Sequence, residues 1–97
     1  MTPIKNVKPL SAEALFDLLK KEFADYINGK LNSNLTIEYA HVYDVINVLF
    51  PEVIEGNAFT ITISDEEITL INNATTSDYN TELLEQHLKD FLNEKAG

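Results

Sequence analysis

The chain has 97 residues, of which 44% are hydrophobic, and sixteen acidic side chains outnumber seven lysines to give a formal net charge of −9. This length fits one domain over residues 1–97 with one core, and the hydrophobic content excludes the intrinsically disordered class. The negative charge repels nucleic-acid phosphates and anionic lipids, and arginine, the usual reader of phosphates and guanines, is absent. We therefore expect no direct binding of nucleic acid and no membrane association.

Cysteine is also absent, which removes disulfides and thiolate sites and fits a reducing compartment. The N-terminal residues include two lysines but no apolar run behind them, which argues against a secretory signal. No apolar stretch approaches the ~20 residues that a membrane-spanning helix needs. We expect a soluble, cytoplasmic protein.

In chain order, residues 1–10 are expected to form an extended arm, because Pro3 and Pro9 both oppose helix. Ser11 then suits a helix N-cap. The apolar residues after it recur at the three- and four-residue spacing of an amphipathic helix: Ala12, Leu15, Phe16, Leu19, Phe23, Tyr26 and Ile27. Gly29 is expected to end this helix in the left-handed conformation.

Residues 35–50 allow two interpretations. Alternation of apolar and polar residues over 35–39 predicts a short strand. After that strand, the spacing of Val42, Val45, Ile46 and Leu49 fits a helix that Pro51 would end. Because several of these residues are β-branched, a strand through the same region stays open as an alternative.

The rest of the chain predicts a hairpin and a final helix. Two alternating apolar runs, 59–63 and 68–71, flank an acidic turn. A polar loop over 72–80 precedes an amphipathic stripe of leucine and phenylalanine over 83–92. The predicted fold class is α+β, in the order α-(β)-α-β-β-α, with helices packed on a two- or three-stranded antiparallel sheet.

Motifs for catalysis or cofactor binding are missing, so we predict no catalytic, metal or cofactor site. The three glycines stand apart, which excludes a standard phosphate-binding loop. On a helix, Glu38, His41 and Asp44 would share a face and could bind a divalent ion, but Glu38 is expected in a strand. A small hydrolase or metal protein that uses His41 or His87 remains an alternative.

The candidate partner-binding residues are the acidic side chains at two predicted turns: Glu52, Glu55, Asp65, Glu66 and Glu67. Such carboxylates are ordinary at solvated turns, but an array of them can also imitate DNA phosphates and occupy a basic protein surface.

We therefore interpret the chain as a small acidic protein-binding module, an inhibitor or adaptor of the kind that phages and mobile elements carry. The abundance of lysine, isoleucine and asparagine, typical of AT-rich coding, supports such a source. An assembly subunit that forms homo-oligomers through strand edges or helix stripes is the second interpretation, and Tyr39, Tyr43 and Tyr79 are candidate interface aromatics.

Overall fold

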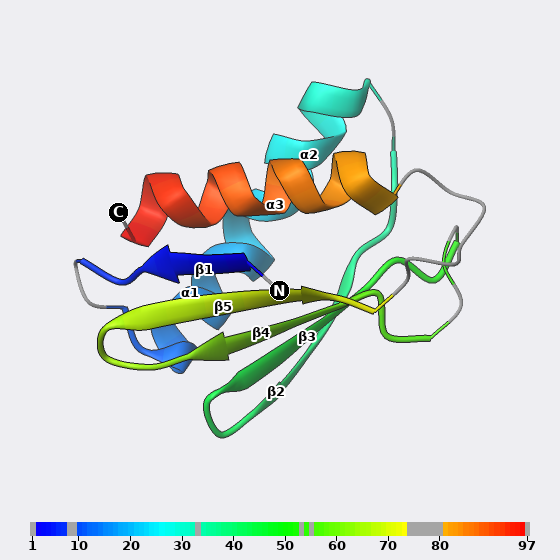
Figure 1. Ribbon diagram of the computed structural model, residues 1–97. Coiled ribbons are helices and arrows are strands. Elements are labelled where there is room, and N and C mark those ends of the chain that lie inside the picture. The colour runs from blue at the N-terminus through cyan, green and yellow to red at the C-terminus, as the bar shows by residue number, and fades with distance from the viewer. Residues whose placement is uncertain are drawn as a thin grey trace.

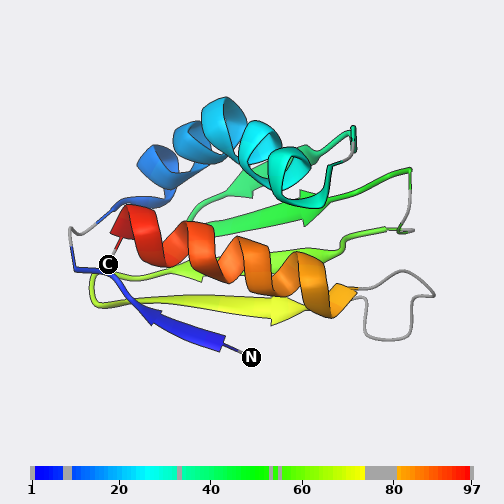
Figure 2. The ribbon, with the colours of Figure 1, turned by 90° about the horizontal axis from the view of Figure 1, so that it is seen from above.

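The computed structural model describes residues 2–7, 10–32, 34–52, 54, 56–73 and 81–96. Their elements are β1 (Thr2–Lys5), α1 (Ala12–Leu18), the π-helical η1 (Leu19–Phe23), α2 (Ala24–Leu31), β2 (Glu38–Val42), β3 (Val45–Leu49), β4 (Phe59–Ile63), β5 (Glu67–Asn72) and α3 (Thr81–Ala96). The strands form one antiparallel sheet in the order β1-β5-β4-β3-β2, and the helices lie on one of its faces (Figures 1 and 2).

The sheet corrects the predicted fold. The class is α+β, but the sheet has five strands rather than two or three, and the element order is β-α-β-β-β-β-α. One additional strand comes from the expected extended arm, where β1 pairs with β5. Ile4 is buried opposite Ile68, so burial of apolar side chains favours this pairing over a free arm.

The predicted helix over Val42–Leu49 is the second correction, because these residues form the β2–β3 hairpin. The apolar residues of this region have helix-like spacing because Val42 lies before, and Val45 after, a two-residue turn at Tyr43 and Asp44. Within β3, buried Ile46 and Val48 alternate with partly exposed neighbours, which is the period of a strand. The β-branched residues therefore follow their strand preference.

The first helical segment begins as predicted and ends later than predicted. The Ser11 Oγ accepts a hydrogen bond from the Ala14 N–H at 3.1 Å. Gly29 lies inside α2, and Asn32 provides the left-handed C-cap with φ 52° and ψ 51°. Asparagine tolerates this conformation better than most residues. The segment therefore continues two residues past Gly29.

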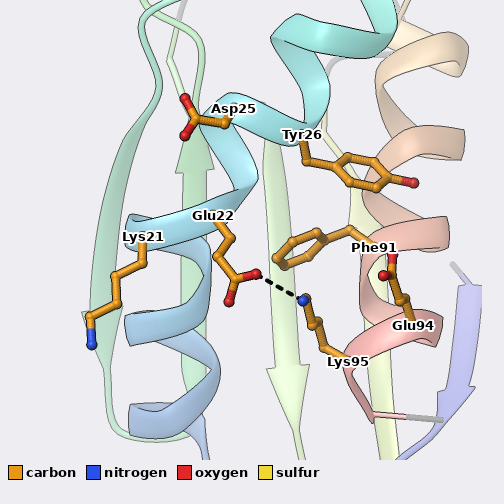
Figure 3. Close-up of a pocket in the computed structure, with 7 residues that line it drawn as sticks. All are labelled: Lys21, Glu22, Asp25, Tyr26, Phe91, Glu94 and Lys95. Atoms are coloured by element: carbon orange, nitrogen blue, oxygen red, sulfur yellow. Dashed lines mark hydrogen bonds and ion pairs between the residues drawn. The ribbon is translucent and has the colours of Figure 1, made fainter.

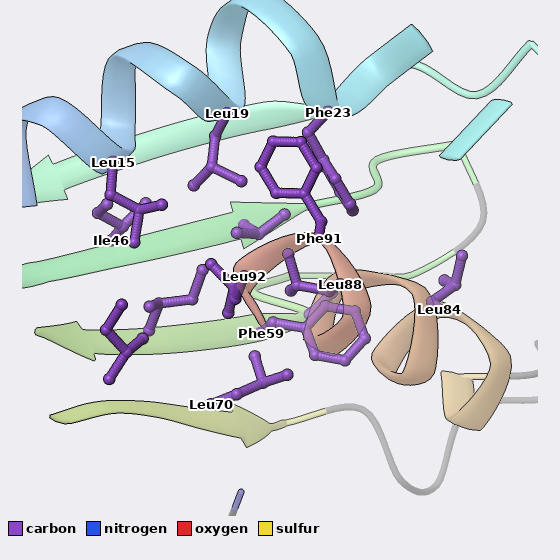
Figure 4. Close-up of a cluster of buried hydrophobic side chains, with 14 of the residues drawn as sticks. Leu15, Leu19, Phe23, Ile46, Phe59, Leu70, Leu84, Leu88, Phe91 and Leu92 are labelled. Atoms are coloured by element: carbon purple, nitrogen blue, oxygen red, sulfur yellow. The ribbon is translucent and has the colours of Figure 1, made fainter. Parts of the chain in front are cut away.

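The core lies between the sheet and the helices (Figure 4). α1 packs against β2 and β3, α3 packs against β1 and β5, and α2 contacts α3. The rings of Phe23 and Phe91 meet edge to face at a centroid distance of 5.2 Å, which joins the two helical segments. In the part of the chain described, no helix combines the length and apolarity needed to cross a membrane.

The β4–β5 hairpin and α3 confirm the predicted hairpin and final helix, whereas most of the predicted loop between them, with Tyr79, lies outside the described residues. Each strand of this hairpin buries one side: the covered face contains Phe59, Ile61, Ile63, Ile68 and Leu70. Threonines and partly exposed residues occupy the opposite face, which none of the described elements covers.

Candidate partner-binding surface

The β4–β5 and β2–β3 turns lie at the same end of the sheet, at the left and at the bottom of Figure 1 respectively. The N–H of Ile63 donates to the carbonyl of Asp44 at 2.8 Å, so the β2–β3 turn lies next to the β4–β5 turn. This contact places Asp44 at the same end of the sheet as Asp65, Glu66 and Glu67, and all four acidic residues are exposed. We call these four residues the acidic end. The sequence singled out its last three members but placed Asp44 on a helix.

The β4–β5 turn is held by its own hydrogen bonds. The Ser64 N–H donates to the Glu67 carbonyl at 2.8 Å, and the Glu67 N–H donates to Ser64 Oγ at 3.0 Å. The Ser64 hydroxyl in turn donates to the Glu67 carbonyl at 2.9 Å. These bonds fix the turn that presents the carboxylates.

Asn6, which follows β1, fastens the same turn to the beginning of the helical segment. Its side chain is only 5% exposed. The Nδ2 group donates to the carbonyls of Ser64, at 2.9 Å, and Leu10, at 2.8 Å, while Oδ1 accepts from the Leu10 N–H at 2.8 Å. Its backbone N–H donates to the Glu66 carbonyl at 3.0 Å. The acidic end is therefore a preorganised surface.

A hollow of about 330 Å³ opens beside the acidic end, between this turn and the start of α1. Its lining combines apolar side chains, two hydroxyls and two carboxylates: Leu10, Ser11, Ala12, Asp44, Ile63, Ser64 and Asp65. Such a lining suits a lysine or arginine, whose aliphatic stem packs on apolar groups while its charged head meets carboxylates. Glu13 in the first turn of α1 offsets the partial positive charge of the helix N-terminus.

The described lysines are unevenly distributed over the molecule. Of the lysines that the structure describes, Lys5 alone lies on the sheet, in register with Glu67. The others lie on the helices, among the acidic residues there: Lys20, Lys21, Lys30, Lys89 and Lys95. Among the described residues, five of the six lysines therefore lie on the helices rather than at the acidic end.

Tyr43 projects from the neighbouring β2–β3 turn and is 90% exposed. Its φ of 54° lies in the left-handed region, which is strained for a bulky residue. The carbonyl of Tyr43 accepts a hydrogen bond from His41 Nε2 at 2.7 Å, which supports the turn. Because the Tyr43 ring is exposed and its backbone is strained, this residue contributes little to the stability of the fold.

The structure separates Glu52 from the acidic end. Glu52 follows β3 at the opposite end of the sheet, where its Oε1 accepts a hydrogen bond from the Thr36 N–H at 2.6 Å. This bond lowers the pKa of the Glu52 carboxyl. Glu52 therefore braces the chain before β2. Glu55, the other predicted residue near this turn, lies outside the described residues.

A second hollow, of about 410 Å³, lies between the two helical segments (Figure 3). The rings of Tyr26 and Phe91 line it at a centroid distance of 5.4 Å. Glu22 and Lys95 form an ion pair of 2.8 Å across its opening. Lys21, Asp25 and Glu94 also line the hollow, so it offers a ligand both aromatic and charged surface.

The histidines are not arranged as the metal hypothesis requires. Because β2 is a strand, the side chains of Glu38 and His41 lie on opposite faces. The His41 ring packs against Phe16 at a centroid distance of 5.1 Å, and half-buried His87 lies on α3. Within the described ranges, no three His, Asp or Glu side chains form a group that could hold a metal ion.

Comparison of the chain with protein-family models, with curated proteins and with solved structures gives no match.

Proposed function

We propose that this chain is a protein-binding module whose acidic end docks on a basic surface of a partner protein. The observation that carries the proposal is the hollow lined by both Asp44 and Asp65, because it brings carboxylates of the two turns to one place. Clustered charges of one sign raise the local potential, accelerate association with an oppositely charged surface and fix its orientation.

The hollow beside Asp44 and Asp65 supplies a specific contact for this docking. A lysine or arginine of the partner would place its stem on Leu10 and Ile63 and its charged head between the two carboxylates. The hydrogen-bonded turn needs little reordering on binding, which reduces the entropic cost of the complex. An inhibitor that occupies a nucleic-acid-binding channel is one form that such a module can take.

Capture experiments with charge-reversal variants test the proposal. Tagged protein is used to capture partners from its native host, and the bound proteins are quantified by mass spectrometry at increasing salt. The test variant combines Asp44→Lys, Asp65→Lys and Glu66→Lys, and it leaves Glu67 opposite Lys5. The control combines Asp17→Lys, Glu82→Lys and Asp90→Lys on exposed helix positions. Both variants have the same net charge of −3, because each replacement adds two positive charges to −9.

We expect the test variant to lose a captured basic protein that the control still retains, and we expect capture by the wild type to weaken steeply with salt. Equal capture by both variants, or capture that is indifferent to salt, would contradict docking through the acidic end.

A further inference from the structure

The two outer edges of the sheet differ in their free backbone groups. At the β1 edge, the Asn6 N–H bonds to Glu66 of the neighbouring turn. Because bonding alternates along an antiparallel strand, Ile4 also faces β5, and Pro3 and Lys5 face outward. Pro3 has no N–H to donate, and a lysine discourages pairing, so this edge is poorly suited to a further strand.

At the β2 edge, the backbone bond of Asp44 shows which residues direct their N–H and C=O groups toward a neighbouring strand and which direct them outward. Its carbonyl bonds to Ile63 of β4, so alternate β3 residues face β4, and Val45, Asn47 and Leu49 face β2. Their register partners are Val42, Ala40 and Glu38. The N–H and C=O groups of Tyr39 and His41 therefore point out of the sheet. No bond to these groups is found from the described residues, and β2 contains neither proline nor lysine.

We propose that β2 pairs antiparallel with β2 of a second copy of this chain, with Ala40 facing Ala40 across a two-fold axis. In this register, Tyr39 lies opposite His41 of the second copy, and each of the two equivalent pairs exchanges two backbone hydrogen bonds. The two sheets become one continuous sheet of ten strands.

Backbone bonding and side-chain chemistry together select Ala40 as the centre. The phase of the bonds allows an axis through any residue of β2. An axis at Tyr39 would set His41 opposite Ile37, and an axis at His41 would set Tyr39 opposite Tyr43, both outside β2, whereas an axis at Ala40 pairs Tyr39 with His41. A centre at Glu38 sets two carboxylates against each other, and a centre at Val42 runs β2 past the turn at Asp44. With Ala40 at the centre, Glu38 faces Val42, and strained, exposed Tyr43 lies level with partly buried Ile37 of the second copy. No acidic residue of β2 faces another.

This interface does not use the acidic end. Because the paired strands are antiparallel, the acidic ends of the two copies point in opposite directions along the strands. A five-residue edge is small beside the ~800 Å² per partner of a typical stable interface. We therefore expect a reversible dimer that forms as the protein concentration rises.

Sedimentation equilibrium between 10 µM and 1 mM tests the proposal with two matched variants. Ala40→Lys places two ammonium groups directly opposite each other, whereas Val42→Lys places a lysine opposite Glu38 of the second copy. Both variants add one lysine to the same exposed face of β2. We expect Ala40→Lys to weaken the dimer by about tenfold or more, and Val42→Lys to preserve or strengthen it. A wild type that is monomeric at 1 mM would overturn the proposal. Equal weakening by both variants would also overturn it, since that result indicates association through the open sheet face.

Cysteine cross-linking tests the register. The natural chain has no cysteine, so each single variant has one thiol. Non-hydrogen-bonded antiparallel partners have Cα atoms about 4.5 Å apart, within disulfide range. Ala40→Cys should therefore form a covalent dimer under mild oxidation. Val42→Cys should not, because the two copies of residue 42 are separated by four positions along the strand, roughly 13 Å. Faster cross-linking at position 42 than at position 40 would contradict this register. The triple variant of the acidic end should still dimerise, and no more weakly than the wild type because it carries less charge, so this proposal and the proposed function can fail separately.

Discussion

Tyr43 and Tyr39 lie four residues apart on one hairpin and have opposite environments. Tyr43 is exposed on a strained turn, whereas the Tyr39 ring is half-buried beneath α1, and its hydroxyl donates to the Leu19 carbonyl at 3.2 Å. Leu19 begins the π-helical η1, and such segments often mark functional positions in helices. The two tyrosines therefore contribute differently to stability.

Replacing Tyr43 with glycine should stabilise the monomer. Glycine adopts a positive φ without steric cost, and the exposed ring contributes little packing. We expect the free energy of unfolding, measured by urea denaturation at micromolar concentration, to rise by about 0.5–1 kcal/mol. Tyr43→Ala is the control, because it removes the ring but keeps the strain. A similar gain in Tyr43→Ala would show that the ring, rather than the backbone conformation, is unfavourable.

Replacing Tyr39 with phenylalanine should change the alkaline stability of the protein. Burial raises the pKa of Tyr39 above its ordinary value of about 10. The contribution of the neutral phenol to stability is complete below the unfolded pKa and is lost as the pH rises toward the folded pKa. We expect the wild-type free energy of unfolding to fall above pH ~10, and to fall less steeply in Tyr39→Phe. At pH 7 this variant should lose about 1 kcal/mol with the hydrogen bond to Leu19. Tyr43→Phe, altered at an exposed ring, should keep the wild-type slope, and equal slopes in all three proteins would contradict the assignment.

At the scale of elements, the acidic end depends on the attachment of β1 and the residues after it to the β4–β5 turn. The Asn6 side chain makes one hydrogen bond to the Ser64 carbonyl of this turn and two with the backbone of Leu10. Its Nδ2 group faces two carbonyl oxygens, so a carboxylate in its place would repel both.

Asn6→Asp should therefore destabilise the fold by about 2 kcal/mol or more, and Asn6→Ala by about 1–3 kcal/mol, in urea denaturation at neutral pH. Asn93→Asp adds the same charge on an exposed face of α3 and should change stability by less than about 0.5 kcal/mol. Equal effects at the two positions would indicate that added charge, and not the Asn6 contacts, determines the loss.

For the whole molecule, the net charge of −9 disfavours the compact state through self-repulsion. Salt screens this repulsion, since the Debye length falls from ~30 Å at 0.01 M to ~10 Å at 0.1 M.

We expect the melting temperature, followed by circular dichroism, to rise by a few degrees between 10 and 200 mM NaCl, which corresponds to roughly 1 kcal/mol or less for a domain of this size. The two triple-lysine variants, with a net charge of −3 each, should show a smaller rise. If salt raised the melting temperature of these variants as much as that of the wild type, the effect of salt would not come from net charge.

Local patterns were sufficient for the elements whose apolar spacing is uninterrupted. The Ser11 cap, the first helical segment, the β4–β5 hairpin and α3 follow from periodicity and capping chemistry, which act over a few residues. The acidic turn at Asp65 and Glu66 was also evident, because turn residues and charge are local properties.

Long-range contacts decided the remainder. β1 exists because Ile4 is buried opposite Ile68, more than sixty positions away, and no local pattern records that pairing. The β2–β3 hairpin is defined by pairing with β4, whereas its own spacing also fits a helix. The register of the sheet places Asp44 at the acidic end, and it places Glu52 at the opposite end of the sheet, against Thr36. Composition and charge thus determined which surfaces the chain can offer, and tertiary pairing determined which charges share one surface and which strand edge stays open.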